Sequence, residues 1–226
     1  MHCQSIPGGT TALGRLDAQE RIDFIQASLR RGARRARIWA WTWAGIYSTL
    51  TAGELVLGLT ASSSDTKIDD FVGAGASFVG VAVLGILPLK VLGDQRWLER
   101  RLKHVRLDED RCAILADAER LLLRDAASEA FGSGPLVHAG SLLFNAALGV
   151  FLGAVFGHWD QAAITALTGA AVGEIQIVTQ PTDVVRSLSR YRNGDLGIGP
   201  ARVPPAWMLV PSASRDHYGL QLALTF

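Results

Sequence analysis

The sequence lacks the residues on which most metal and catalytic sites depend. Only two cysteines occur among 226 residues, Cys3 and Cys112, and neither they nor His138 have a second Cys or His at ligand spacing. Tetrahedral metal sites need several such ligands close together, so neither a metal nor a cofactor is expected. No nucleophile and base stand together in a recognisable motif, which places an intramembrane enzyme last among the functional classes considered.

Basic residues are scarce in two connecting segments. Only Lys67 lies between residues 59 and 71, and residues 157–161 contain none. The segments before residue 38, from 90 to 124 and after 181 hold the other lysines and arginines. Because cytoplasmic segments retain Lys and Arg, this alternation predicts an inner (plasma) membrane protein with both termini cytoplasmic. In that reducing compartment we expect Cys3 and Cys112 to stay unpaired.

Four apolar stretches fit this alternation. Each approaches the roughly 20 residues that a helix needs to cross a bilayer. They cover residues 38–59, 71–92, 136–156 and 162–178. The tryptophans near their ends are expected at the headgroup level, namely Trp39, Trp41, Trp43 and Trp97. A soluble helical bundle is the alternative interpretation.

The predicted fold is an all-α membrane protein with four transmembrane helices, arranged as two tandem helix-TM-TM repeats. The segments are a cytoplasmic N-terminal segment with an amphipathic helix (1–37), a first transmembrane hairpin (38–92), a cytoplasmic helical connector (93–135), a second transmembrane hairpin (136–180) and a cytoplasmic tail (181–226). The tail contains a Gly/Pro linker and a possible β-hairpin.

The repeat rests on short matches between the two halves. Ala44-Gly45 matches Ala139-Gly140 before the first and third spans turn back, and Val79-Gly80 matches Val172-Gly173 in the return spans. Such parallel repeats are related by an axis along the membrane normal. Chance recurrence of Gly and Ala, which are common in membrane helices, is the alternative.

Small residues follow one face of the third span at four-residue spacing. They are Ser141, Asn145, Gly149, Gly153 and Gly157. Folding about Trp159 places Gly149 level with Gly169, and Asn145 level with Gly173 and Glu174. By the same count His138 is level with Thr179 and Gln180. We therefore expect helix packing through Gly149, Gly153, Gly169 and Gly173.

A polar cluster follows from this register and gives the candidate intramembrane site. It contains Glu174, Asn145, Gln176, Thr179 and His138. Glu174 is the first choice, because an ionisable residue within a span is expensive and usually faces a bundle interior or a watery cavity. A hydrogen bond from Asn145 to Glu174 either serves a proton site or simply locks the hairpin. Glu54 is expected to reach toward headgroups.

The tail is expected to form strands at residues 207–210 and 218–226, around a loop at 211–216. The last ten residues alternate apolar positions and end in Phe226, and so resemble the final strand of bacterial outer-membrane β-barrels. That resemblance implies an outer-membrane location as the alternative, although the chain lacks the other strands of a barrel. Residues 173–181 (GEIQIVTQP) loosely resemble uncharacterised bacterial multi-span membrane proteins, a likeness that implies no activity.

The leading functional hypothesis is a structural or interaction component that assembles through glycine-rich helix faces. Its partners are the lipid bilayer and a second copy or another membrane protein, and no nucleic acid is expected because the amphipathic segments are not basic and aromatic enough. The alternative is a small carrier or proton-coupled channel that uses Glu174 and Asn145.

Overall fold

The computed structural model describes residues 3, 6–86, 89–104, 111–197, 206–214 and 217–225. They belong to two units, Met1–Leu196 and Gly197–Phe226. The helices of the first unit are α1 (Thr11–Gly14), α2 (Ala18–Thr60), α3 (Ser64–Ile86), α4 (Val91–Lys103), α5 (Arg111–Gly132), α6 (Pro135–Phe156), α7 (Trp159–Val178) and α8 (Asp183–Arg192).

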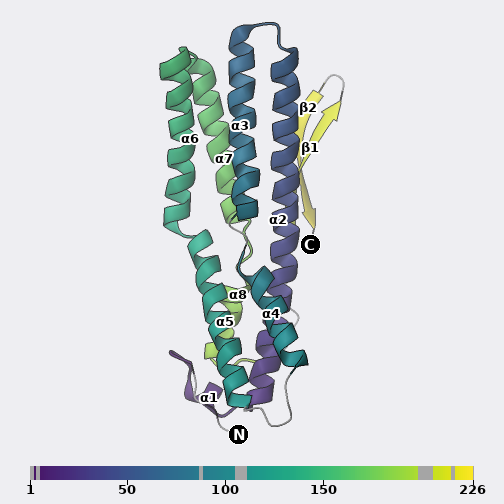
Figure 1. The fold of residues 1–226 in the computed structure, drawn as a ribbon, viewed down its shortest axis with the longest axis vertical. Coiled ribbons are helices and arrows are strands. Elements are labelled where there is room, and N and C mark those ends of the chain that lie inside the picture. Colours follow the sequence, from purple (N-terminus) through teal and green to yellow (C-terminus); the bar gives the residue numbers. More distant parts are fainter. Residues whose placement is uncertain are drawn as a thin grey trace. The chain divides into compact units, whose positions relative to one another are not determined.

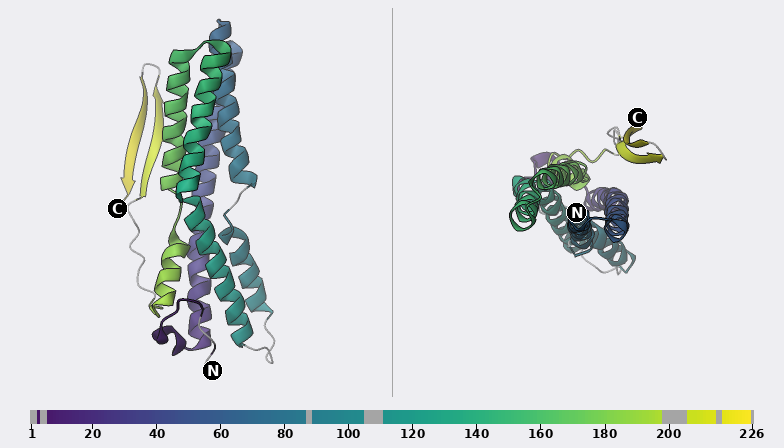
Figure 2. Two further views of the ribbon diagram at one scale, coloured as in Figure 1. Left: turned by 90° about the vertical axis from the view of Figure 1, so that its left-hand side faces the viewer. Right: turned by 90° about the horizontal axis from the view of Figure 1, so that it is seen from above.

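The first unit has two zones along its length (Figures 1 and 2). In one zone the first half of α2 packs with α4, α5 and α8 as a helical bundle, and in the other the second half of α2 pairs with α3 while α6 pairs with α7. Helix α2 runs without interruption through both zones, whereas a break at residues 133–134 separates α5 from α6.

The bundle has an ordinary hydrophobic core. Its buried side chains come from α2, α4, α5 and α8 and from the segment before α2. The largest fully buried apolar ones include Leu13, Ile22, Ile25, Leu29, Leu98, Leu115 and Leu122. Each such burial contributes about 1.5–3 kcal/mol relative to exposure to water. The bundle is thus stabilised as a water-soluble domain would be.

The other zone exposes its large apolar side chains. Ile86, Leu136 and Leu167 are 76%, 75% and 73% exposed. Three helical stretches, those that contain α3, α6 and α7, are long and apolar enough to cross a membrane. Contiguous apolar surface of this extent is not tolerated in water, so these helices indicate a membrane location.

The predicted end of the second span is wrong. Helix α3 ends at Ile86, and Val91 instead begins α4 and is 1% exposed in the bundle core. Val91 belongs to the bundle because the chain leaves the apolar zone between α3 and α4. Residues 87 and 88, near the predicted end of this span, lie outside the described residues.

Local signals fix several helix ends. The Asp17 side chain accepts the N–H of Gln19 at 2.8 Å and caps α2. Pro135 occupies the first turn of α6, where its missing N–H costs nothing. Gly157 follows α6 with a φ of 77°, a left-handed conformation that favours glycine, and α7 starts two residues later.

The second unit contains two antiparallel strands, β1 (Ala206–Ser214) and β2 (His217–Thr225). Ala206 lies opposite Thr225 and Ser214 opposite His217. The ladder therefore runs through Pro211, where the sequence suggested a loop. Phe226, which carries the resemblance to a closing barrel strand, lies outside the described residues.

Candidate functional site

The α6–α7 hairpin reverses about Gly157 and not about Trp159. A Cβ on Gly149 would lie 2.9 Å from the Cβ of Ala166 and 3.1 Å from the carbonyl oxygen of Ala162. Gly149 is therefore level with Ala162–Ala166, and its expected position opposite Gly169 is wrong by about one turn. The physical reason is the left-handed Gly157, which turns the chain earlier than a count centred on Trp159 assumed.

Asn145 changes partners with this register. Its side-chain oxygen occupies the space that a Cβ on Gly169 would need, and Ser141 takes the corresponding space at Gly173. The Asn145 Nδ2 donates to the backbone oxygen of Ser141, one turn earlier in its own helix, at 2.8 Å. The expected hydrogen bond from Asn145 to Glu174 is thus absent from the described contacts.

The other packing glycine, Gly153, faces the first residue of α7. A Cβ at Gly153 would overlap the indole ring of Trp159. Together with Gly149, Gly169 and Gly173, it lets α6 and α7 approach closely. These glycines therefore pack against residues of the same hairpin.

Glu174 pairs with His138. The His138 Nδ1 lies 2.5 Å from Glu174 Oε2, and both side chains are half-buried. The second carboxylate oxygen, Oε1, is buried without a hydrogen-bond partner. The structure therefore places an imidazole and a carboxylate in contact near the junction between the zones.

Gln176 and Thr179 turn away from this pair and toward α2. The Tyr47 hydroxyl donates to Gln176 Oε1 at 2.7 Å, and the Trp43 Nε1 donates to Thr179 Oγ1 at 3.1 Å. Trp39 donates to the same hydroxyl at 3.3 Å. The expected single cluster is therefore two: one between α6 and α7, and one between α2 and α7.

These contacts also determine how far the tryptophans of α2 are exposed. Trp43 is 7% exposed because its ring lies between α2 and α7, whereas Trp41 is 75% exposed. Trp41 alone of the three on α2 presents its ring fully to the surroundings at the start of the apolar zone.

Glu54 does not reach outward as expected. It accepts a hydrogen bond from Ser77 Oγ at 3.0 Å, across the α2–α3 interface. Gly73 makes room for it, since a Cβ there would lie 2.7 Å from Glu54 Oε1. A partner on the return helix satisfies this carboxylate, so it does not need headgroup water.

His158 joins the two hairpins at the end remote from the bundle. Its Nδ1 lies 2.7 Å from Asp69 Oδ1, and its Nε2 lies 3.6 Å from Asp65 Oδ1. The hydrogen bond to Asp69 raises the pKa of His158. The sequence analysis missed this contact because the partners are about ninety residues apart.

A second polar network lies inside the bundle. Arg21 is fully buried; its Nε donates to the Tyr191 hydroxyl at 2.9 Å, and its Nη2 pairs with Glu119. The Tyr191 hydroxyl also donates to Glu119. Burial and that hydrogen bond raise the pKa of Tyr191. The network links α2, α5 and α8.

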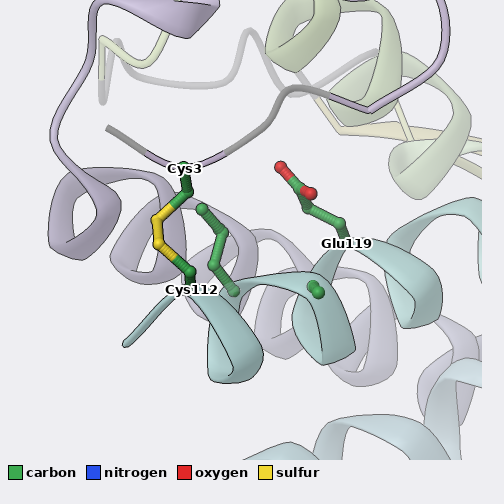
Figure 3. Close-up of a pocket in the computed structure, with 5 residues that line it drawn as sticks. Cys3, Cys112 and Glu119 are labelled. Atoms are coloured by element: carbon green, nitrogen blue, oxygen red, sulfur yellow. A yellow bond between two sulfur atoms is a disulfide. The ribbon is translucent and has the colours of Figure 1, made fainter. Parts of the chain in front are cut away.

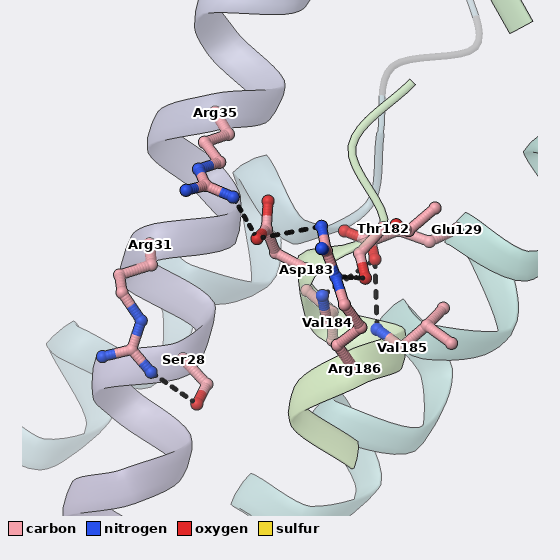
Figure 4. Close-up of polar contacts among 9 residues, drawn as sticks. All are labelled: Ser28, Arg31, Arg35, Glu129, Thr182, Asp183, Val184, Val185 and Arg186. Carbon is pink, nitrogen blue, oxygen red and sulfur yellow. Dashed lines mark hydrogen bonds and ion pairs between the residues drawn. The ribbon is translucent and has the colours of Figure 1, made fainter. Parts of the chain in front are cut away.

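Glu129 of α5 caps α8 from outside that helix (Figure 4). Its Oε2 accepts the N–H groups of Val184 at 2.8 Å and Val185 at 3.2 Å. Asp183, in the same turn, pairs with Arg35 of α2 at 2.5 Å. These contacts tie α8 to α2 and α5 just where the chain leaves the apolar zone.

An acid pair bridges α4 and α5. Arg124 forms a two-pronged ion pair with Asp94, and the neighbouring Asp125 is buried beside that carboxylate. Burial, followed by the contact with Asp94, raises the pKa of Asp125 to about 9. Burial therefore favours the neutral form of Asp125, whose two side-chain oxygens have no hydrogen-bond partner among the described residues.

The two cysteines form a disulfide, contrary to the expectation (Figure 3). Cys3 and Cys112 are 109 residues apart in the chain, yet their Cα atoms are 5.4 Å apart, within the usual range for a disulfide. The sulfurs border a pocket lined also by Leu115, Ala116 and Glu119. The prediction of unpaired cysteines was wrong because it rested only on the assigned compartment, and the sequence does not reveal that the two cysteines are close in space.

No group of His, Cys, Asp or Glu side chains suited to a metal ion occurs among the described residues. No protein-family model matches this chain, and no curated protein or solved structure is significantly similar to it. The class defined by the fold is therefore a helical protein with apolar helices of membrane-spanning length joined to a bundle with its own core.

Proposed function

We propose that this chain is a four-span structural membrane component that self-associates through one face of α2. That face, called here the outer α2 face, comprises Ile38, Thr42, Gly45, Thr49, Ala52 and Val56. All six residues are exposed, and they repeat at alternating spacings of four and three. A 3.5-residue repeat of small residues is the pattern through which membrane helices pair closely.

The proposal rests on positions of the outer α2 face that lack a packing or hydrogen-bond partner among the described residues. Nothing lies within 4 Å of the Cβ position of Gly45. Thr42 and Thr49 are exposed, and among the described residues neither side chain has a hydrogen-bond partner. Polar groups at membrane depth favour a partner helix over lipid. The glycines first expected to mediate assembly pack inside the α6–α7 hairpin instead.

Two further features support four spans in a tandem arrangement. The second half of α2 is less apolar than the other three spans, but it pairs with α3 along its length and Glu54 is satisfied there. Gly80 of α3 contacts Tyr47 of α2, and the corresponding Gly173 of α7 contacts Ser141 of α6. Each return helix thus approaches its partner at a matching glycine, as a duplication would produce.

The test is the oligomeric state of the purified full chain in detergent. Gly45→Leu and Ala52→Leu should each shift the assembly toward monomer, because a bulky side chain separates the paired backbones. Gly75→Leu on α3 is the matched control, since Gly75 is also exposed with nothing within 4 Å. An unchanged mass for both α2 variants, or an equal change in the control, would refute assembly through this face.

A proton-coupled carrier is the second candidate, and the His138–Glu174 pair favours it. The pair combines two titratable groups with a buried carboxylate oxygen that lacks a partner. Under this hypothesis Glu174→Gln abolishes proton flux in proteoliposomes while assembly persists. Equal flux in the variant would leave only the structural role of the pair.

For orientation we propose that the bundle and the N-terminus face the cytoplasm, as the distribution of arginines predicts. The Cys3–Cys112 disulfide points to an oxidising compartment instead. If the bundle lies in an oxidising compartment, the disulfide is stable there. If it lies in the cytoplasm, the disulfide forms only under oxidation. The hairpin of β1 and β2 is proposed to serve contacts with the membrane surface or a second subunit.

A further inference from the structure

We propose that Arg34, Arg37 and Lys90 form a binding site for the phosphate of an anionic membrane lipid, beside the exposed ring of Trp41. The inference rests on the membrane insertion proposed above, but it does not depend on assembly through α2. It concerns the level at which the bundle meets the apolar zone.

The three cations lie at one level of the first unit. Helices α2 and α4 are antiparallel neighbours (Figure 1). Arg30 Nε lies 3.0 Å from Glu99 Oε1, and the Cβ position of Gly32 lies 3.4 Å from Val91 Cγ2. Because both helices rise about 1.5 Å per residue, these two contacts place Lys90 level with residues 33–39 of α2. Arg34 and Arg37 fall within that window.

The same level is the edge of the apolar zone. Ile38 follows Arg37 directly and is 58% exposed. Arg34, Arg37 and Trp41 succeed one another at spacings of three and four, so they share one side of α2. All three are exposed, as is Lys90 at the start of α4. An exposed indole beside cations at this height is suited to the headgroup layer.

These cations are not neutralised within the described residues. No carboxylate there pairs with Arg34, Arg37 or Lys90. The acids closest along the helices are committed elsewhere, since Asp94 holds Arg124 and Glu99 holds Arg30.

The other side of α2 offers a contrast. Arg35, at the same height, is paired with Asp183, and Arg186 also approaches that carboxylate at 3.5 Å. Among the described residues, the chain therefore supplies an internal anion for Arg35, which faces α8, but none for Arg34, Arg37 and Lys90. A lipid phosphate carries the negative charge that Arg34, Arg37 and Lys90 could pair with, and it lies in the headgroup layer at their level.

The experiment titrates phosphatidylglycerol into the full-length protein in a neutral detergent and follows the unfolding temperature. Phosphatidylglycerol should raise it, and phosphatidylcholine should not. A juxtamembrane cation strengthens binding about fivefold, so Arg34→Gln combined with Arg37→Gln should weaken the apparent affinity about thirtyfold. The effect should decrease with added salt.

The matched control is Arg96→Gln combined with Arg100→Gln. It removes the same charge from two exposed positions of α4 that lie farther from the apolar zone. Equal responses to the two lipids, or equal loss in control and test variants, would overturn the site. If millimolar inorganic phosphate displaces the lipid, the site is one for free anions and the lipid assignment is wrong.

The failure of this site and the failure of α2 assembly are distinguishable. Gly45→Leu should leave the response to phosphatidylglycerol intact even where it produces a monomer. The doubly substituted arginine variant should keep the oligomeric mass of the unmodified protein. If the arginine variant loses its mass together with its lipid response, the cations serve assembly and the lipid site is refuted.

Discussion

The Glu129 carboxylate reaches across from α5 to accept the backbone N–H of Val184 at 2.8 Å in the first turn of α8. A negative group suits a helix N-terminus, where N–H groups lack partners within the helix. Burial opposes the charge, however, and raises the pKa of Glu129 to about 7. The joint between α5 and α8 thus depends on a carboxyl that titrates near neutrality.

We predict that Glu129→Gln removes a pH dependence of stability between pH 5 and 7.5. The folded pKa is raised above that of the unfolded chain, so the folded state binds more protons in this range. Stability contributed by Glu129 is therefore present below about pH 4.5 and lost as the pH rises through 7. The full change is about 3 kcal/mol. Thermal unfolding of both proteins at several pH values measures it.

Glu99→Gln is the control for this series. Glu99 is paired with Arg30 at the surface, and hydrogen bonding from Arg30 lowers its pKa. It should stay ionised from pH 5 to 7.5, so its substitution should leave the slope unchanged. A Glu129→Gln protein with the original slope would contradict the assignment to Glu129.

Asp125 gives a second prediction at higher pH. Burial and Asp94 raise the pKa of Asp125 to about 9, so its contribution to stability is lost as the pH rises through 9. Asp125→Asn keeps the shape without the titration, and should lose less stability than the unmodified protein between pH 7 and 9.5. Denaturant unfolding at the two pH values tests this, and parallel losses would argue against a raised pKa for Asp125.

Asp94→Asn should behave differently from Asp125→Asn. It deprives Arg124 of its ionic partner. We expect destabilisation at both pH values, because the ion pair is lost whatever the state of Asp125. Identical profiles for the two variants would mean that the two carboxyls have no separate roles.

The register of the α6–α7 hairpin can be tested at Gly169. A methyl group there overlaps the side-chain oxygen of Asn145. Gly169→Ala should therefore destabilise the protein by about 1–3 kcal/mol, the usual cost of overpacking. Gly75→Ala, in open space on α3, is the control and should be nearly neutral. Equal melting temperatures for the two variants would indicate a different register.

The disulfide predicts a measurable loss of stability on reduction. It closes a loop of about one hundred residues and holds the segment that buries Ile6 and Leu13 against the bundle. Cys112→Ser should lower the free energy of unfolding by about 2–4 kcal/mol. A reducing agent should lower the melting temperature of the unmodified protein but not of the variant. No effect of reduction would show that the thiols are free in solution.

Labelling with a membrane-impermeant maleimide completes that experiment by locating the bundle. Intact and broken cells are compared with and without a permeant reductant. Reaction only after breakage places Cys3 and Cys112 in the cytoplasm, as the arginine distribution predicts. Reaction in intact cells after reduction places them outside, and the proposed orientation would then be wrong.

The polar residues show where sequence reasoning reached its limit. A charge in an apolar stretch singled out Glu174, and four-residue spacing singled out Asn145 and Gly149. Their partners depend on where the hairpin reverses, and a shift of the centre from Trp159 to Gly157 exchanges every pair across α6 and α7. The buried network around Arg21 was missed because an arginine in an amphipathic helix normally lies at the surface.

Hydropathy is a local property of each segment, so the sequence was sufficient to predict a mainly helical chain with several helices apolar enough for a membrane. It was not sufficient to predict which side chains meet. The approach of Cys3 to Cys112, the pairing of His138 with Glu174 and the burial of Glu129 against α8 all join distant segments. Such contacts depend on helix register and crossing, which no single segment encodes.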